Sequence, residues 1–176
     1  MIEVPVLARV ATDQDEEFLK DLFFEVRFPE FEPANLPEAQ LRTLLAQQYD
    51  AMRDHYSRAF PDAVYQILER DGTPIGYEAV REGEEIHLID IALRENQRNQ
   101  GIGTSRMNHL LETARLAGKS VILSVEVFNP ARRLYERLGF EEYEQMGMYK
   151  RMRWNGREPL QGANMTVANH SLQSVQ

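Results

Sequence analysis

Apolar and polar residues alternate along this chain with two different periods, and the change of period predicts where strands and helices lie. Strand-like alternation or runs of β-branched residues occur over residues 4–10, 63–70, 74–81, 84–93, 121–127, 140–143 and 146–154. Apolar residues at helical spacing occur over residues 12–26, from Leu36 to Tyr56, after Gly103 and, briefly, after Asn129. The expected order is one strand, two helices, three strands, a helix, a strand, a helix and two strands.

Turn and capping residues support these boundaries. Thr12 with Asp15 is an N-cap pattern for the first helix, and residues 36–38 start the second. Residues 71–72, Asp-Gly, predict a hairpin, and residues 145–147 the turn of the last hairpin. We find no repeat and no dividing linker, so one domain is expected over residues 1–154. A polar C-terminal segment, residues 155–176, follows as a flexible or partner-bound end.

A glycine-rich run, Arg98 to Gly103, lies between the fourth predicted strand and the helix after it. Glycines at a helix start let an anion approach unpaired backbone N–H groups, and the helix dipole favours negative charge there. A dinucleotide-binding fingerprint is excluded because Arg106 stands at its third glycine. A P-loop is excluded because no Gly-Lys-Ser/Thr follows a glycine of this run after the four spacer residues that the motif needs. A phosphate-binding loop is therefore expected; the alternative is an ordinary turn whose glycines serve packing.

A second motif follows the next strand. Asn129 is an N-cap residue before Pro130, and residues 134–140 read Leu-Tyr-Glu-Arg-Leu-Gly-Phe. The loop Arg98-x-x-Gly-x-Gly and this Leu-Tyr-x-x-x-Gly-Phe motif together resemble the GCN5-related N-acetyltransferase (GNAT) superfamily, over about residues 4–154. One departure is Ala131, which follows Asn129 by two places where the family motif has three.

The resemblance implies an α/β (α+β) fold, in which helices flank a mixed, mostly antiparallel sheet. The fourth and fifth strands would run parallel and splay apart, with a bulge near Asp90-Ile91 that frees backbone groups to pair with acetyl-CoA. The residues expected to bind acetyl-CoA are Ile91, Leu93, Arg98, Asn99, Gln100, Gly101, Gly103, Thr104, Asn129 and Arg132. Arg132 and Arg133 either meet the CoA 3′-phosphate or contact only solvent.

Acetyl transfer to an amine requires a base, because an alkyl amine with a pKa near ~10.4 is protonated at neutral pH. Candidates are Glu85, His87 and Asp90 on the fourth strand and Glu126 on the fifth. The resemblance places His87 where several family members carry a base glutamate, and an imidazole suits that task. The alternatives are a hydrogen-bonded strand histidine at His87 and a brace for the bulge at Asp90.

The resemblance assigns two further catalytic roles. The backbone N–H of Ile91 would stabilise the oxyanion, and Tyr135 would be the general acid toward the departing CoA thiolate. Tyr49, His55 and Tyr56 are candidates to line the acceptor pocket, although such a stripe at helical spacing is more often core.

Composition narrows the chemistry. The chain of 176 residues has 43% hydrophobic and 27% charged residues, as in an ordinary soluble domain, and no cysteine. Thiolate metal sites and a covalent cysteine intermediate are thus excluded, so we expect no metal and direct attack in a ternary complex. No signal-peptide pattern and no membrane-length apolar run is present. We therefore expect a cytoplasmic protein without a membrane partner.

Negative charge is concentrated ahead of the residues expected to bind acetyl-CoA. The formal net charge of the chain is −8, which argues against nucleic-acid binding. Residues 12–58 hold 11 Asp and Glu against 5 Lys and Arg. This segment is either a solvated helix face or a negative field that attracts a cationic acceptor.

The expected function is acetyl transfer from acetyl-CoA to a primary amine, either a small molecule or a peptide. Two alternatives remain: a non-catalytic module that binds or senses acyl-CoA, and a structural, partner-binding protein. Whether the protein forms a homodimer is left open.

Overall fold

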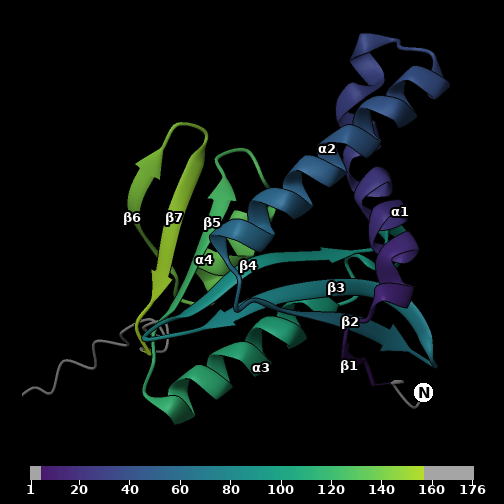
Figure 1. Cartoon of the computed structure of the whole chain (residues 1–176). Coiled ribbons are helices and arrows are strands. Elements are labelled where there is room, and N and C mark those ends of the chain that lie inside the picture. Colours follow the sequence, from purple (N-terminus) through teal and green to yellow (C-terminus); the bar gives the residue numbers. More distant parts are fainter. Residues whose placement is uncertain (1–4, 157–176) are drawn as a thin grey trace, which may run out of the picture.

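The computed structural model describes residues 5–156, which form a seven-stranded mixed sheet with helices on both faces (Figure 1). The strands are β1 (Leu7–Val10), β2 (Val64–Arg70), β3 (Thr73–Glu82), β4 (Ile86–Leu93), β5 (Val121–Glu126), β6 (Glu141–Met146) and β7 (Tyr149–Trp154). They lie in the order β1-β2-β3-β4-β5-β7-β6, and only β4 and β5 are parallel neighbours in the described sheet. The predicted fold class and element order are confirmed.

The helices form a layer on each side of the sheet. They are α1 (Glu16–Arg27), α2 (Glu38–Ala59), α3 (Ile102–Ala117) and α4 (Ala131–Arg137). Helices α1 and α2 lie on the opposite side of the sheet from α3 (Figure 1). Short 3-10 turns precede α1 (η1, Asp13–Asp15), join α1 to α2 (η2, Phe28–Ala34) and follow β4 (η3, Glu95–Gln97).

Two main apolar cores hold these layers together, because alternate strand residues face opposite sides of the sheet. One core joins α1 and α2 to β2 and β3 through Leu19, Leu22, Tyr49, Ile67, Tyr77 and Ala79. The other joins α3 and α4 to β4, β5 and β7 through buried residues that include Met107, Leu111, Tyr135, Ile86, Leu88, Val121 and Met152. Burying such side chains stabilises each layer by roughly 1.5–3 kcal/mol per large residue.

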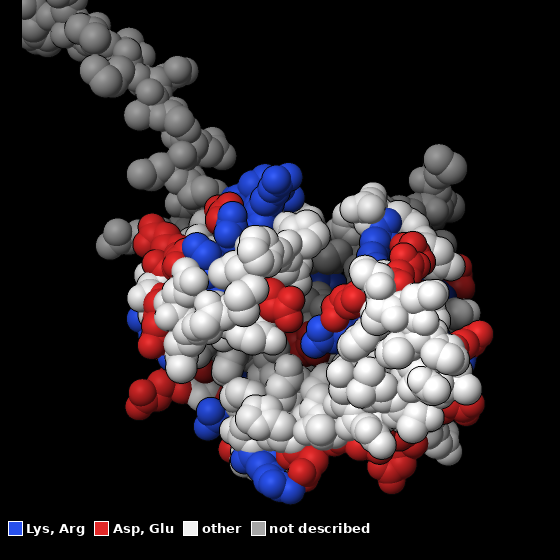
Figure 2. Space-filling view, turned by 90° about the horizontal axis from the view of Figure 1, so that it is seen from above, with Lys and Arg blue, Asp and Glu red and all other residues white. Residues whose placement is uncertain are grey.

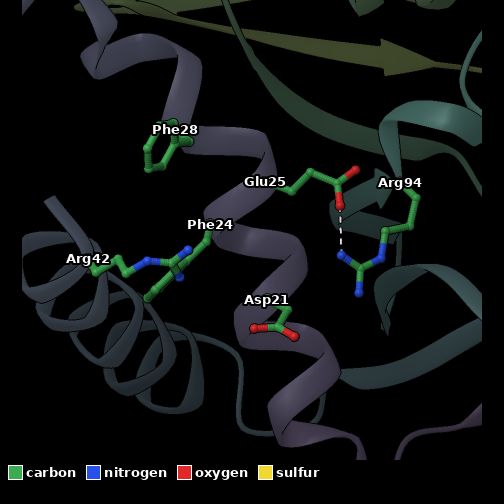
Figure 3. A pocket seen from close by; sticks show the side chains of 6 residues that line it. All are labelled: Asp21, Phe24, Glu25, Phe28, Arg42 and Arg94. Atoms are coloured by element: carbon green, nitrogen blue, oxygen red, sulfur yellow. Dashed lines mark hydrogen bonds and ion pairs between the residues drawn. The ribbon is translucent and has the colours of Figure 1, made fainter. Parts of the chain in front are cut away.

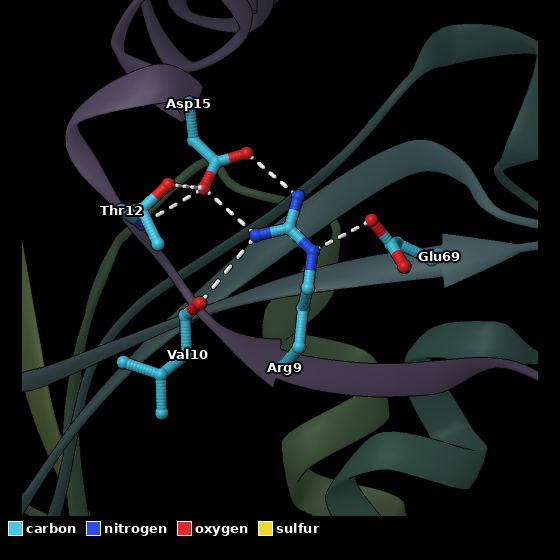
Figure 4. A network of polar contacts seen from close by, with 5 residues as sticks. All are labelled: Arg9, Val10, Thr12, Asp15 and Glu69. Atoms are coloured by element: carbon cyan, nitrogen blue, oxygen red, sulfur yellow. Dashed lines mark hydrogen bonds and ion pairs between the residues drawn. The ribbon is translucent and has the colours of Figure 1, made fainter.

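Charged side chains fasten the sheet to its flanking elements. Arg9 of β1 donates to Asp15 at 2.7 and 2.8 Å and to Glu69 of β2 at 2.8 Å (Figure 4). The hydrogen bonds from Arg9 and Thr12 hold the pKa of Asp15 well below its usual range. On the other face, the buried Glu78 of β3 accepts hydrogen bonds from Arg106 of α3 at 2.5 and 3.1 Å.

The sheet opens into a wedge between β4 and β5. Their pairing covers only Ile86–Leu88 and residues 121–123. Opposite β3, Ala79 pairs with Asp90 and Val80 with Leu88, so the bulged residue of β4 is Ile89. The predicted splay is confirmed, and the bulge lies one residue before the predicted position.

The last hairpin differs from the sequence prediction in where its two strands meet. Strand β6 continues to Met146, because Gln145 and Met146 pair with Lys150 and Tyr149. The turn is therefore Gly147-Met148, and Gly147 with φ of 59° takes the left-handed conformation that such a turn needs.

The predicted polar segment from residue 155 lies, apart from its first two residues, outside the described ones. No helix among residues 5–156 has the length and apolar character needed to cross a bilayer.

Candidate active site

The glycine loop lies at the open end of the wedge, between β4 and α3. Gly101 stands at the N-cap of α3 with φ of 78°, and Asn99 also has a positive φ of 59°. These left-handed residues turn the chain so that the first N–H groups of α3, which have no partner within the helix, begin at Ile102. The predicted glycine turn at a helix start is confirmed.

Side chains of the loop bond within the loop and its neighbours. Arg98 donates to the Leu93 carbonyl at 3.0 Å, and Gln100 donates to the Asn96 carbonyl at 2.7 Å. Arg70 of β2 donates to Gln97 and to Gln100 at 3.0 and 2.9 Å. Arg98 and Gln100, both predicted to bind acetyl-CoA, therefore fix the shape of the loop in this structure.

A carboxylate of α1 holds the segment that leads from β4 into the glycine loop. Glu25 accepts from Arg94 at 2.6 Å and from the Glu95 backbone N–H at 2.5 Å. Burial alone would raise the pKa of Glu25, but these hydrogen bonds and the Arg94 charge outweigh it and lower that pKa. The contact forms one wall of a pocket of about 260 Å³ between α1, α2 and Arg94, in which Phe24 and Phe28 also take part (Figure 3).

Asp90 lies in the wedge, just after the bulge. Its carboxylate accepts a hydrogen bond from the Tyr77 hydroxyl and another, at 2.8 Å, from the backbone N–H of Ile91. Burial raises the pKa of Asp90, although both hydrogen bonds and the charge of Arg27 act against the rise. The N–H predicted to stabilise an oxyanion thus has the Asp90 carboxylate as its partner here.

Tyr135 of α4 is buried in the core that joins α3 and α4 to the sheet. Its exposed fraction is 7%, and its ring packs on Phe140 with centroids 5.8 Å apart. Burial, and then the charge of Asp90, raise the pKa of Tyr135 to about 12. The phenol therefore stays protonated at neutral pH, as a proton donor must.

The charge of Asp90 also affects the pKa of three more tyrosines. Burial is the main cause that raises the pKa of Tyr56, Tyr65 and Tyr77, and the Asp90 charge adds to it in each case; the pKa of Tyr56 reaches about 12. The rings of Tyr65 and Tyr77 stack with centroids 6.3 Å apart. Sequence patterns identify Tyr56 as a pocket candidate but miss Tyr65 and Tyr77, which carry no motif.

The other acceptor-side candidates lie elsewhere. Tyr49 is 2% exposed and belongs to the core under α1, so the core alternative holds for it. His55 is exposed on α2 and its ring lies 5.9 Å from that of Tyr56.

His87 lies in the part of β4 that is paired with β5, and Glu85 lies one residue before β4 begins. Glu85 accepts from Ser120 at 2.6 Å and from Arg153 at 3.1 Å, and the Ser120 bond is the main cause that lowers its pKa. The His87 ring meets Phe60 edge-on at 5.1 Å. Burial, followed by nearby arginines, lowers the pKa of His87. Both residues line a pocket of about 350 Å³ that also includes Arg81 and Ile122.

The β5–α4 connection holds two more predicted residues. The Asn129 side chain accepts from the Ala131 N–H at 2.9 Å and so caps α4, as the sequence predicts. Arg132 donates to the Val127 carbonyl at 3.2 Å and pairs with Glu136 at 3.1 Å.

A charged rim spans the mouth of the wedge. Arg27, where α1 ends, pairs with Glu30 at 2.9 Å and lies 3.9 Å from Glu126 of β5, which accepts from Tyr149 at 3.2 Å. Figure 2 shows acidic and basic side chains around a hollow between the two lobes of the molecule. The rim therefore joins the α1–α2 side to the β5–β7 side.

Comparisons with known proteins agree with this architecture. The sequence model of the acetyltransferase (GNAT) family matches residues 21–140. An uncharacterized N-acetyltransferase of Methanocaldococcus jannaschii is 36% identical over 98 residues, which are 49% of this chain and 42% of that protein. The chain thus spans less than half the length of this curated relative.

Solved structures share the fold at low identity. The PaiA N-acetyltransferase of Thermoplasma acidophilum, solved with coenzyme A, has a TM-score of 0.65 and 16% identity over 86% of this chain and 99% of that one. An acetyltransferase of Thermus thermophilus has a TM-score of 0.61 and 18% identity over 88% and 99%. A chimera based on the spermidine N-acetyltransferase SpeG of Vibrio cholerae has a TM-score of 0.59 and 19% identity over 86% and 95%.

Proposed function

Because the chain belongs to the GNAT acetyltransferase family, we propose that it moves the acetyl group of acetyl-CoA to a primary amine, by direct attack in a ternary complex. The observation that carries this proposal is the wedge itself. A helix N-terminus with a glycine turn lies at its open end. The hydrogen-bonded carboxylate of Asp90 follows the bulge, and the buried Tyr135 is close enough for the Asp90 charge to raise its pKa. One side suits an anion and the other suits a proton transfer.

On the cofactor side, backbone groups do most of the proposed binding. The first N–H groups of α3, from Gly103 and Thr104 onward, would hold the pyrophosphate. Residues 89–93 of β4 have no pairing with β5, so Ile91 and Leu93 can pair with the pantetheine arm as a strand would. Asn99 in the loop, and Asn129 and Arg132 in the β5–α4 connection, remain candidates, while the loop side chains keep the turn in shape.

On the chemical side, acetyl-CoA supplies the activated acyl group, and this chain supplies the proton transfers. Tyr135 would donate a proton to the departing sulfur. Of the two bases predicted first, Glu85 is held by Ser120 and Arg153. His87 has no such ionic partner in the described structure, and its lowered pKa keeps the imidazole neutral and able to accept a proton. His87 is therefore the better candidate of these two.

The function is tested by presenting acetyl-CoA with a panel of amines and following CoA release with a thiol reagent. The chain has no cysteine, so the reagent reads only the product thiol. Polyamines head the panel because a structure of similar fold is named a spermidine N-acetyltransferase. Aminoglycosides, amino acids and peptides with free N-termini follow. Mass spectrometry then identifies the acetylated product.

We expect release with at least one amine. Tight acetyl-CoA binding by calorimetry without release from any amine would support the sensing module instead. A failure to bind acetyl-CoA at all would leave the structural, partner-binding alternative.

A further inference from the structure

Asp90 differs from the other carboxylates that are shielded from solvent. Asp15 is paired with Arg9, Glu78 with Arg106 and Glu25 with Arg94. Among residues 5–156, no Lys, Arg or His lies within ion-pair distance of Asp90; its hydrogen-bond partners are the neutral Tyr77 hydroxyl and Ile91 N–H. A desolvated carboxylate without a cation is costly, so this position calls for a positive charge from outside the chain.

The surroundings of Asp90 suit an ammonium group. The titratable and charged groups that act on it, or on which it acts, are Arg27 of α1, Tyr56 of α2, Tyr65 of β2, Tyr77 of β3 and Tyr135 of α4. The charge of Arg27 acts on Asp90, but its guanidinium is paired with Glu30 and not with Asp90. Aromatic rings around a carboxylate attract alkylammonium ions through both the ring quadrupole and the charge.

We propose that the Asp90 carboxylate binds the ammonium form of the acceptor and takes its first proton, beside the stacked rings of Tyr77 and Tyr65. The proposal rests on the proposed function and names the acceptor-binding base of that same site. It also defines the acceptor as an unhindered primary amine on an apolar or cationic chain. A carboxylate beside the amine would be repelled by Asp90.

Each proton in this reaction has a donor and an acceptor. The ammonium gives one proton to Asp90. The lone pair of the neutral amine nitrogen then forms the C–N bond at the thioester carbonyl carbon. The C–S bond breaks, and the sulfur takes a proton from Tyr135. The second proton lost by nitrogen restores the phenol, and Asp90 returns its proton to solvent. One proton is released for each acetyl group transferred.

A purely structural role for Asp90 predicts a different outcome. As a brace of the bulge, Asp90 only needs to satisfy the Ile91 N–H and the Tyr77 hydroxyl. Asn fulfils both, because its carbonyl accepts from Ile91 and its amide donates to the phenol oxygen. Asp90→Asn thus retains the brace and removes the base.

The first experiment measures kcat, acetyl-CoA affinity and thermal unfolding of Asp90→Asn with the amine found above. The matched control is Asp50→Asn, at an exposed position of α2. We expect kcat to fall by ~10²–10⁴, the usual worth of a general base, with acetyl-CoA affinity unchanged. His87→Gln should lose less. A kcat of Asp90→Asn within about threefold of the parent, or a larger loss in His87→Gln, overturns the proposal.

The second experiment does not depend on the Asn variant folding. The Tyr77 hydrogen bond lowers the pKa of Asp90, so Tyr77→Phe should move the acid limb of kcat, at saturating substrates, to higher pH. A brace lost with Tyr77 would instead lower kcat equally at every pH, and an unshifted limb overturns the proposal. If the parent protein acetylates no amine, the proposed function fails, whereas an active parent with an unshifted limb refutes Asp90 alone.

Discussion

Gly103 offers a sharp test, because its effects on folding and on binding should have opposite signs. It is the second residue of α3, and a Cβ built there meets only the Leu134 Cδ2 atom, at 3.9 Å. The folded chain therefore accepts alanine without a clash. Since glycine in a helix is worse than alanine by about 0.5–1 kcal/mol, Gly103→Ala should be more stable than the parent. For a chain of this size, that raises Tm by roughly 1–4 °C.

Binding should change in the opposite direction. If the pyrophosphate approaches the backbone at Gly103, the added methyl group occupies that approach, and acetyl-CoA affinity should fall at least tenfold, or roughly 1.4 kcal/mol. Calorimetry gives the affinity and thermal unfolding gives the stability. Asn108→Ala, at an exposed position of the same helix, should raise stability and leave affinity alone. A stable Gly103→Ala protein with parental affinity would refute the phosphate role of this turn.

Three further predictions test the proposed chemistry and the stability of the fold. Tyr135→Phe keeps the ring and loses the proton, so kcat should fall by ~10²–10⁴ while acetyl-CoA affinity holds; steady-state turnover at the parental rate would exclude the role. In Gly76→Ala, the new Cβ would lie 2.4 Å from the Ala92 carbonyl oxygen, so urea unfolding should show a loss of about 1–3 kcal/mol or more, and an unchanged midpoint contradicts this. Arg9 lowers the pKa of Asp15 in the folded protein. The ionised Asp15 therefore contributes to the free energy of unfolding above its pKa in the unfolded chain, near ~3.9. That contribution is lost as the pH falls through its pKa in the folded chain. The unfolding free-energy gap between the parent and Asp15→Asn should thus narrow from pH 7 to pH 3, and a constant gap would show that the charge plays no part.

The sequence predicts those parts of the molecule that depend on neighbours along the chain. The element order, the turn at Gly101 and the cap at Asn129 each follow from a few adjacent residues with known backbone preferences. The predicted β6 is too short because polar residues at an exposed edge strand carry no apolar alternation.

The acceptor side could not be predicted in the same way. Tyr56, Tyr65, Tyr77 and Tyr135 belong to four different elements, and only the folded sheet brings them to Asp90. No spacing in the sequence encodes such a cluster, because it depends on strand register and on which face of the sheet each residue occupies. The sequence alone therefore leaves Asp90 between a base and a brace of the bulge.

The short pairing between β4 and β5 also has a mechanical consequence. Among the described strands, the only pairing that joins the four strands before the wedge to the three after it is that of residues 86–88 with residues 121–123. A ligand that pairs with β4 and touches α4 spans this seam and holds the two blocks together. At a hundred times its Kd, such a ligand adds about 2.7 kcal/mol to the folded state. Amide protons beside the seam should then exchange with solvent more slowly. The bound ligand would thus stabilise the fold for as long as it stays bound.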